Sequence, residues 1–211
     1  MGKPLLCLIA VGGDYYTYIS PSILKILSKI FDVCILTDDE NIRKYKDKNL
    51  CFDIEIYQEK IFTYFAKLLF PARMAKKHKR GAYYCDVNKL KNLETFRIKE
   101  GDEYKFTYIS HWPIATFFKE MEEAKYWRKV LWFWVIKGYD YQFLKTIEEH
   151  TYYIPYHRNI DKFLYTVEEI KPIFEYTSIM NENPYSGVGN GEGLALAYAL
   201  DNSNIELVKQ I

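Results

Sequence analysis

The sequence has no excess of charge of either sign. Its 29 Lys and Arg residues stand against 28 Asp and Glu residues, which gives a formal net charge of +1 at pH 7. A protein that attracts nucleic acid through its overall field needs a large positive excess, because the phosphate backbone supplies most of that attraction. The composition therefore argues against a nucleic-acid partner. The densest basic segment, residues 76–80, is typical of the solvated end of a helix, where cations complement the helix dipole.

Cysteine is scarce, and long apolar runs are missing. The four cysteines form no C-x-x-C pair, which argues against a disulfide framework or a zinc site. The longest apolar stretch, near residues 130–136, is far too short to span a bilayer, and the first residues do not have the pattern of a secretory signal. We therefore expect reduced, buried thiols in a cytoplasmic protein without a transmembrane segment.

Two common catalytic signatures are also missing. Gly12 and Gly13 follow the first apolar run, but they lack the G-x-G-x-x-G spacing of dinucleotide-binding enzymes, which argues against a Rossmann-type oxidoreductase. The four histidines lack the H-E-x-x-H spacing of zinc peptidases. His150 or His157 stays open as a metal ligand, although a lone histidine is more often structural.

Aromatic residues, in contrast, are abundant. They make up 18% of the chain and include 20 Tyr and 13 Phe. Tyr fits the boundary between core and surface, because its ring is apolar and its hydroxyl is polar. Tyr is also a residue that stacks on sugars and nucleobases, so the composition is compatible with a binding site for either.

The first 90 residues have the pattern of a nucleotide-binding unit. Residues 5–11 are a short apolar run that ends in glycines, as expected for a strand buried on both faces of a parallel sheet. Ser20 and Pro21 then predict the start of a helix, as N-cap and first helical residue. Residues 33–36 predict a second buried strand, which completes a β-α-β unit with a right-handed crossover. We expect a third strand at 52–57, a helix from 61 to about 79 that Pro71 should kink or divide in two, Gly81 as its C-cap residue, and a strand at 82–85.

The remaining residues, 91–211, have weaker patterns. We expect strands at 104–109 and 152–155, helices at 114–121, 126–136 and 194–200, and a mobile glycine-rich loop at 186–193. The whole chain is interpreted as one α/β domain. Residues 1–90 would form its nucleotide-binding half, and residues 91–211 would form a half that binds an acceptor substrate and carries the catalytic residues. It is also compatible with a piece of a longer, multidomain chain.

Polar residues follow three of the expected strands. They are Gly12-Gly13, Asp38-Asp39 and the triplet from Asp86 to Asn88. Because parallel strands end at one edge of a sheet, these residues are expected to gather where ligands bind. Carboxylate and amide oxygens suit Mn²⁺ or Mg²⁺, so Asp86 and Asn88 are candidate metal ligands. Lys67 and Arg73, on the helix before Asp86, are candidates for contacts with phosphate.

These segments resemble a known family. Residues 9–12, the segment 27–31, residues 35–39, the Arg73-Met74 pair and the segment 83–88 resemble, in this order, the retaining family 6 glycosyltransferases. The glycosyltransferases of large DNA viruses that build capsid glycans are a second likeness, which would place the protein in the host cytoplasm. The resemblance implies the GT-A fold, which is an α/β fold with a mixed, mostly parallel central sheet flanked by helices. It also implies transfer of a sugar, such as glucose or a deoxyhexose, from a UDP-sugar donor to a glycan or glycoprotein acceptor, with Mn²⁺ as cofactor.

The resemblance also implies roles for individual residues. The uridine would contact the first strand end, with a tyrosine stacked on uracil, and the ribose or base would lie near the second strand end. Arg73 would face the donor, and Asp86 with Asn88 would bind Mn²⁺ and the ribose. Asn88 departs from the family, which has a second Asp there, so metal affinity would be lower or another acid would have to help. The residues implied in donor binding at the first two strand ends are Ile9, Ala10, Val11, Gly12, Tyr15 or Tyr16, and Asp38 or Asp39.

The catalytic carboxylate stays open among three positions. Asp140, ahead of the strand at 152–155, is loosely similar to the family's acid-rich segment, and Glu149 lies beyond it. Glu192 lies in the glycine-rich loop, which would close over the donor as a lid. Each acid is suited to act as a base toward an acceptor hydroxyl or as a nucleophile. The alternative function is a non-catalytic module that binds a nucleotide or carbohydrate.

Overall fold

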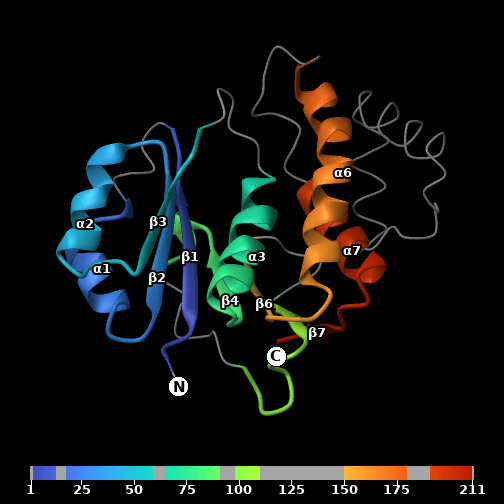
Figure 1. Cartoon of the computed structure of the whole chain (residues 1–211), viewed down its shortest axis with the longest axis horizontal. Coiled ribbons are helices and arrows are strands. Elements are labelled where there is room, and N and C mark those ends of the chain that lie inside the picture. Colours follow the sequence, from blue (N-terminus) through green and yellow to red (C-terminus); the bar gives the residue numbers. More distant parts are fainter. Residues whose placement is uncertain are drawn as a thin grey trace.

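The computed structural model of the chain describes residues 2–12, 18–58, 65–90, 98–109, 150–179 and 191–210. Within these ranges the protein has an α/β fold, in which helices flank a seven-stranded mixed sheet (Figure 1). The strands are β1 (Leu5–Ala10), β2 (Asp32–Thr37), β3 (Asp53–Ile56), β4 (Ala82–Cys85), β5 (Phe106–Tyr108), β6 (Thr151–Ile154) and β7 (Leu207–Lys209). The helices are α1 (Pro21–Leu27), the short 3₁₀ helix η2 (Glu40–Ile42), α2 (Arg43–Asp47), α3 (Ala66–His78), α6 (Ile160–Ile179) and α7 (Gly191–Asn202).

The strand order across the sheet is β3-β2-β1-β4-β6-β5-β7. β1 pairs in parallel with β2 and β4, β2 pairs in parallel with β3, and β5 pairs in parallel with β7. β6 is antiparallel to both of its neighbours, β4 and β5. One sheet therefore contains strands from both halves of the chain, and six of its seven strands run the same way. This confirms the expected α/β class with a mostly parallel sheet.

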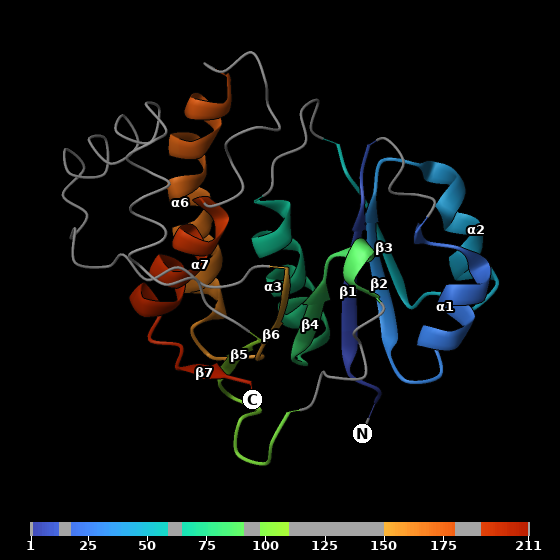
Figure 2. The ribbon, with the colours of Figure 1, turned by 180° about the vertical axis from the view of Figure 1, so that it is seen from behind.

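The sheet is buried on both faces. One apolar cluster joins Cys7 and Ile9 of β1 to α3, α6 and α7, whereas Leu6 and Leu8 of the same strand face the cluster that contains α1. Alternation along β1 explains the split, since successive side chains of a strand point to opposite faces. Figures 1 and 2 show α1 and α2 on one side of β1 and β2, and α3 on the other.

Helix α1 begins as the sequence predicts. Ser20 is the N-cap, its hydroxyl accepts a hydrogen bond from the Ile23 N–H, and Pro21 is the first helical residue. Leu24 and Leu27 are buried on the sheet, but Ile30 lies beyond the end of the helix and is 60% exposed. The buried apolar face of α1 therefore ends at Leu27.

Helix α3 ends near residue 79, as expected, and Pro71 lies inside it without dividing it, but its C-cap residue differs from the prediction. Lys79, not Gly81, adopts the left-handed conformation after the helix, with φ 52° and ψ 38°. The Arg80 N–H then bonds to the Ala75 carbonyl at 3.2 Å, which closes the last turn. Gly81 has another role: a Cβ at this position would lie 1.8 Å from the Tyr153 Oη. The glycine is required for close packing of the chain before β4 against β6.

The second half of the chain differs from its expected pattern in three places. Residues 160–179 form the long helix α6, and residues 207–209 form β7; neither was expected. The prediction of a loop through residue 193 is wrong for Gly191, Glu192 and Gly193, because these residues form the first turn of α7. The helices expected at 114–121 and 126–136 lie outside the described residues.

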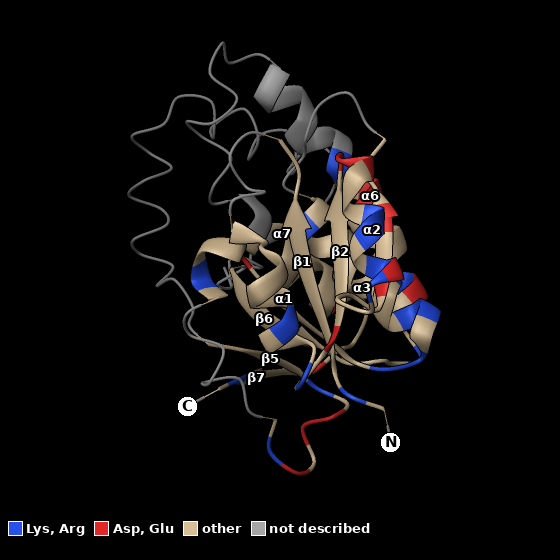
Figure 3. Cartoon of the chain, turned by 90° about the vertical axis from the view of Figure 1, so that its left-hand side faces the viewer, with Lys and Arg blue, Asp and Glu red and all other residues tan. Residues whose placement is uncertain are grey.

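Charges of both signs are mixed on the surface. Figure 3 shows basic and acidic residues next to one another on α2, which agrees with the near-zero net charge of the chain. Within the described ranges, no helix combines the length and the apolar character needed to cross a bilayer.

Candidate functional site

The carboxyl ends of β1, β2, β3 and β4 lie at one edge of the sheet, because these strands run in the same direction. The antiparallel strand β6 begins at that edge. Cys85, the last residue of β4, is level with Thr151, the first residue of β6, and the Asp86 N–H donates to the His150 carbonyl at 2.8 Å. Ligands of open α/β sheets bind beyond such an edge. The fold therefore brings Asp86 and His150 together at the edge where a ligand is expected.

A tight contact joins the ends of β1 and β2. Gly12 has a φ of 73°, a conformation that favours glycine, and its N–H donates to both carboxylate oxygens of Asp38, over 3.3 Å to Oδ1 and 3.1 Å to Oδ2. This confirms that the first two strand ends meet at one edge. Asp38 is exposed, and its carboxylate holds the backbone of the turn.

The residues before Gly12 offer only their backbone to a ligand. The side chains of Ile9, Ala10 and Val11 are buried in the two apolar clusters of the core. Asp39 is also engaged within the protein. Its Oδ1 accepts bonds from the N–H and side-chain amide of Asn41, at 2.9 and 2.8 Å, and thereby caps η2. Of the two acids after β2, Asp38 is the one that lies against the glycine turn.

Asp86 is the centre of a partly buried polar cluster. Its side chain is 15% exposed, and its Oδ2 lies 2.6 Å from the His150 Nδ1 and 3.4 Å from the Lys67 Nζ. The Tyr84 hydroxyl donates to the other oxygen, Oδ1. Three elements contribute these four residues: Tyr84 lies on β4 and Asp86 directly follows it, His150 precedes β6, and Lys67 lies in the first turn of α3.

This environment keeps Asp86 ionised. Burial by itself raises the pKa of a carboxyl group, because the charged form loses hydration. At Asp86 the hydrogen bond from His150, the positive charge of Lys67 and the hydrogen bond from Tyr84 outweigh burial, so the pKa is lowered from 3.8. A negative charge is therefore present at this edge of the sheet at neutral pH.

Asn88 is exposed within a short 3₁₀ turn, residues 87–90, directly after Asp86. The described residues contain no group of three or more His, Cys, Asp or Glu side chains that would hold a metal ion unaided. Asp86 and Asn88 supply one anionic and one neutral oxygen ligand. That donor set fits an ion such as Mg²⁺ or Mn²⁺ that takes one or two protein ligands and fills its remaining positions with phosphate oxygens and water.

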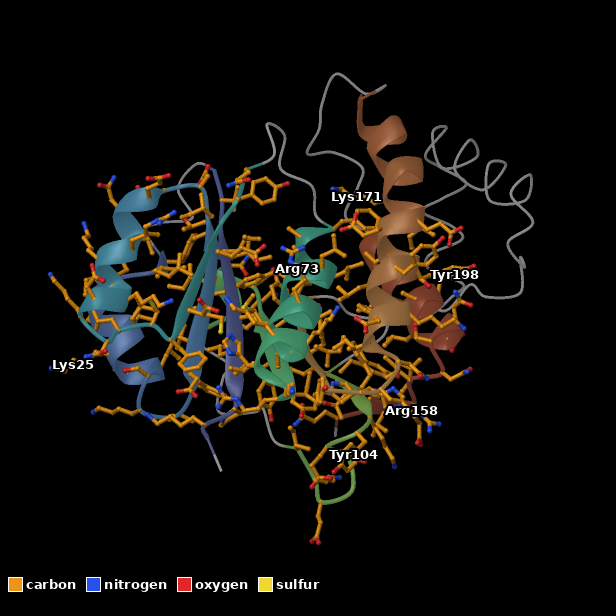
Figure 4. All side chains as sticks on the ribbon, viewed as in Figure 1. Lys25, Arg73, Tyr104, Arg158, Lys171 and Tyr198 are labelled. Atoms are coloured by element: carbon orange, nitrogen blue, oxygen red, sulfur yellow. The ribbon has the colours of Figure 1, made fainter. Side chains whose placement is uncertain are left out.

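Arg73 has a protein partner on the sheet. It forms an ion pair with Glu55 of β3, and both side chains are about one third exposed. Figure 4 labels Arg73 on α3. Lys67, six residues earlier on the same helix, instead reaches Asp86. Lys67 and Arg73, the two cations that were predicted to contact phosphate, therefore pair with different carboxylates. Of the two, Lys67 is the one that pairs with Asp86.

Several predicted site residues lie outside the residues that the structure describes. Tyr15, Tyr16, Asp140 and Glu149 are among the residues that the structure does not describe. Glu192 is placed by its backbone in the first turn of α7, and its side chain is not described. The assignment of the catalytic carboxylate among Asp140, Glu149 and Glu192 therefore stays a prediction.

The cysteines agree with the expectation of reduced, buried thiols. Cys7, Cys34, Cys51 and Cys85 are all free and buried. Burial raises the pKa of Cys51 to about 11 and that of Cys85 to about 12. These two thiols stay protonated at neutral pH, and a protonated thiol is a poor nucleophile.

Sequence reasoning did not connect His150 and Tyr84 with Asp86. Tyr84 lies two residues before Asp86 on β4, so both side chains point to the same face of the sheet, and this spacing was a usable signal. His150 is 64 residues away along the chain. It reaches Asp86 because β6 is antiparallel to β4, a property that no local pattern reveals.

The chain was compared with known protein families and with characterised proteins. Neither comparison assigns a function, so the site is interpreted from its own chemistry. No family model matches the chain, and a search of characterised proteins finds no match.

Proposed function

We propose that this chain is a metal-assisted glycosyltransferase, which binds a UDP-sugar at the carboxyl edge of its parallel strands and transfers the sugar to a glycan. The single observation that carries the proposal is the position of Asp86. It is an ionised carboxylate directly after β4, the strand next to β1, and Asn88 lies two residues further on. The strand order, with β6 as the antiparallel strand, agrees with the GT-A fold that the sequence resemblance implies.

The residues at this edge suit a nucleoside diphosphate. The Gly12 turn, held by Asp38, provides backbone without a side chain, so a ligand can approach it closely. Asp86 and Asn88 would hold a divalent ion, which would neutralise the negative charge that develops on the leaving diphosphate. The choice of uridine comes from the resemblance of residues 9–12 and 83–88 to family 6 glycosyltransferases. A hexose such as glucose, or a deoxyhexose, is the proposed sugar.

The proposal predicts a nucleotide-specific and metal-dependent gain in thermal stability. A ligand that binds only the folded state, at 100 times its dissociation constant, stabilises it by about 2.7 kcal/mol. For a chain of this size that corresponds to a rise in Tm of roughly 5–10 °C. UDP with Mn²⁺ should produce this rise, whereas UDP without metal, GDP and CMP should not. Equal responses to all three nucleotides would contradict the uridine assignment.

Asp86→Asn tests the residue on which the proposal rests. The substitution removes the charge and keeps the size, so the metal-dependent part of the UDP response should disappear. Asp102→Asn is a matched control, because Asp102 is 16% exposed, similar to Asp86, and forms an ion pair with Lys105 in the turn before β5. The control should respond to UDP and Mn²⁺ as the wild type does. A full response in Asp86→Asn would remove Asp86 from the site.

A non-catalytic nucleotide- or carbohydrate-binding module is the second candidate. The neutral Asn88 favours it, because a weaker metal site is compatible with binding that is not followed by transfer. The two candidates separate on release of UDP from UDP-sugars in the presence of Mn²⁺ and glycan acceptors. Release above the level of the Asp86→Asn variant supports the enzyme, and binding without release supports the module.

A further inference from the structure

Lys67 is a lysine whose charge lies largely out of solvent. Its side chain is 10% exposed, and its Nζ lies 3.4 Å from the Asp86 Oδ2, whose side chain is 15% exposed. Its backbone is also fixed, because its carbonyl oxygen accepts a hydrogen bond from the buried Tyr152 hydroxyl. Lysine is rarely buried unless its charge is compensated, since removal of an ammonium group from water is costly. The pairing with Asp86 therefore accounts for the burial of Lys67.

The same carboxylate is needed for the divalent ion of the proposed function. A carboxylate has about four acceptor positions. At Asp86, Lys67 and His150 share Oδ2, and Tyr84 uses Oδ1. An ion bound to Asp86 would lie close to the Lys67 ammonium, and like charges at such short range repel strongly where water is scarce. The ammonium and the divalent ion therefore compete for Asp86.

We infer that Lys67 is a resident counter-ion of Asp86 that changes partner during donor binding. Before the donor arrives, its ammonium balances the Asp86 charge in place of a metal. When a divalent ion enters with the nucleotide, Lys67 leaves Asp86 and its charge binds the donor diphosphate. This inference rests on the proposed function and adds a consequence to it. The divalent ion binds weakly alone and tightly together with UDP, because the diphosphate provides a new partner for the displaced ammonium.

The neighbouring cation shows why Lys67 has this role and Arg73 does not. Arg73 pairs with Glu55, a carboxylate on β3, which is separated from β4 by β2 and β1. A metal ion on Asp86 therefore does not compete directly for the partner of Arg73.

Lys67→Met separates this role from simple support of the fold. Met keeps most of the length of the side chain and removes its charge. We expect Mn²⁺ alone, measured by electron paramagnetic resonance of the free ion, to bind on the order of tenfold more tightly, which corresponds to about 1.4 kcal/mol. UDP in the presence of saturating Mn²⁺, measured by calorimetry, should bind on the order of tenfold more weakly. Two opposite changes are the signature of a counter-ion that changes partner.

Two further variants make the test specific. Lys67→Arg keeps the charge and should retain weak binding of Mn²⁺ alone and tight binding of UDP with Mn²⁺. Lys76→Met removes a charge from the same helix, at an exposed position where Lys76 pairs with Asp161 of α6, and should change neither affinity. Circular dichroism shows whether each variant is folded. If Lys67→Met does not fold, the wild type can still refute the inference, because the inference requires Mn²⁺ to bind more tightly with UDP than without it.

The outcomes distinguish the inference from the proposed function. Failure of wild-type protein to bind UDP with Mn²⁺ overturns both. A second outcome is that the wild type binds UDP and Mn²⁺ tightly, and that Lys67→Met either reduces both the affinity for Mn²⁺ alone and the affinity for UDP with Mn²⁺ or changes neither. This outcome supports the transferase and overturns the partner exchange. Equal affinity of the wild type for Mn²⁺ with and without UDP also overturns the exchange.

Discussion

Asp53, the first residue of β3, lies among three basic side chains and should make stability depend on acid pH. Its Oδ1 lies 3.2 Å from the Lys46 Nζ, and its Oδ2 lies 2.6 Å from the Lys77 Nζ and 3.0 Å from the His78 Nε2. The Asp53 side chain is 7% exposed. Burial alone would raise its pKa, but the hydrogen bonds from Lys77, His78 and Lys46 outweigh it and lower the pKa from 3.8 to about 2.

This shift sets the magnitude and the sign of the prediction. One pKa unit is worth about 1.36 kcal/mol, so ionised Asp53 stabilises the folded state by roughly 2 kcal/mol. Because the pKa is lower in the folded state than in the unfolded chain, the stabilisation is complete well above pH 3.8 and is lost as pH falls toward 2. Asp53→Asn should therefore cost about 2 kcal/mol at pH 7, and about half of that difference should vanish between pH 5 and pH 3.

Urea denaturation of wild type and Asp53→Asn at pH 7, 5, 4 and 3 measures this difference directly. Asp47→Asn is the matched control, because Asp47 is an exposed carboxylate on the adjacent helix α2. The control should change stability by less than about 0.5 kcal/mol at every pH, as most surface substitutions do. A difference between wild type and Asp53→Asn that stays constant from pH 7 to pH 3 would refute the electrostatic explanation.

Two further predictions concern the residues between α3 and β4. Gly81→Ala should destabilise the fold by about 1–3 kcal/mol in chemical denaturation, because the added Cβ would overlap the Tyr153 ring. The cost should fall in a Tyr153→Leu background, and an equal cost there would contradict the proposed overlap. Lys79→Gly should stabilise the fold by about 0.5–1 kcal/mol, since the left-handed conformation at this position suits glycine. Lys76→Gly, inside the same helix, should destabilise by about 1 kcal/mol, and a gain at both positions would argue against the conformational reason.

Local patterns were sufficient for most elements of the first half of the fold, but they did not predict η2 or α2. The buried strands, the Ser20-Pro21 helix start and the strand before Asp86 follow from apolar periodicity and capping chemistry, which act between residues close in the chain. They were not sufficient for the end of α3. The sequence pattern favoured Gly81 as the C-cap residue, but Lys79 takes the left-handed cap conformation, and Gly81 instead allows close packing against Tyr153 on β6. Packing between distant strands decided that position.

The residues of the candidate site were also only partly predictable from the sequence. The polar residues at the strand ends, Gly12, Asp38 and Asp86, were predicted because each follows a recognisable buried strand. His150 and Lys67 as partners of Asp86 were not, since the first depends on the antiparallel direction of β6 and the second on how α3 crosses the sheet. Contacts between residues far apart in the chain depend on topology, which a single sequence encodes only through the packing of the whole protein.

The amino-acid sequence by itself determined which segments near the N-terminus are strands and where α1 begins, that charges of both signs balance, and that acids follow the buried strands. Only the tertiary structure decided what surrounds those acids. Asp86 is enclosed by a lysine, a histidine and a tyrosine from α3, the start of β6 and β4. The physical reason is that backbone preference acts over a few residues, whereas the charge, burial and pKa of a carboxylate depend on every element that packs around it.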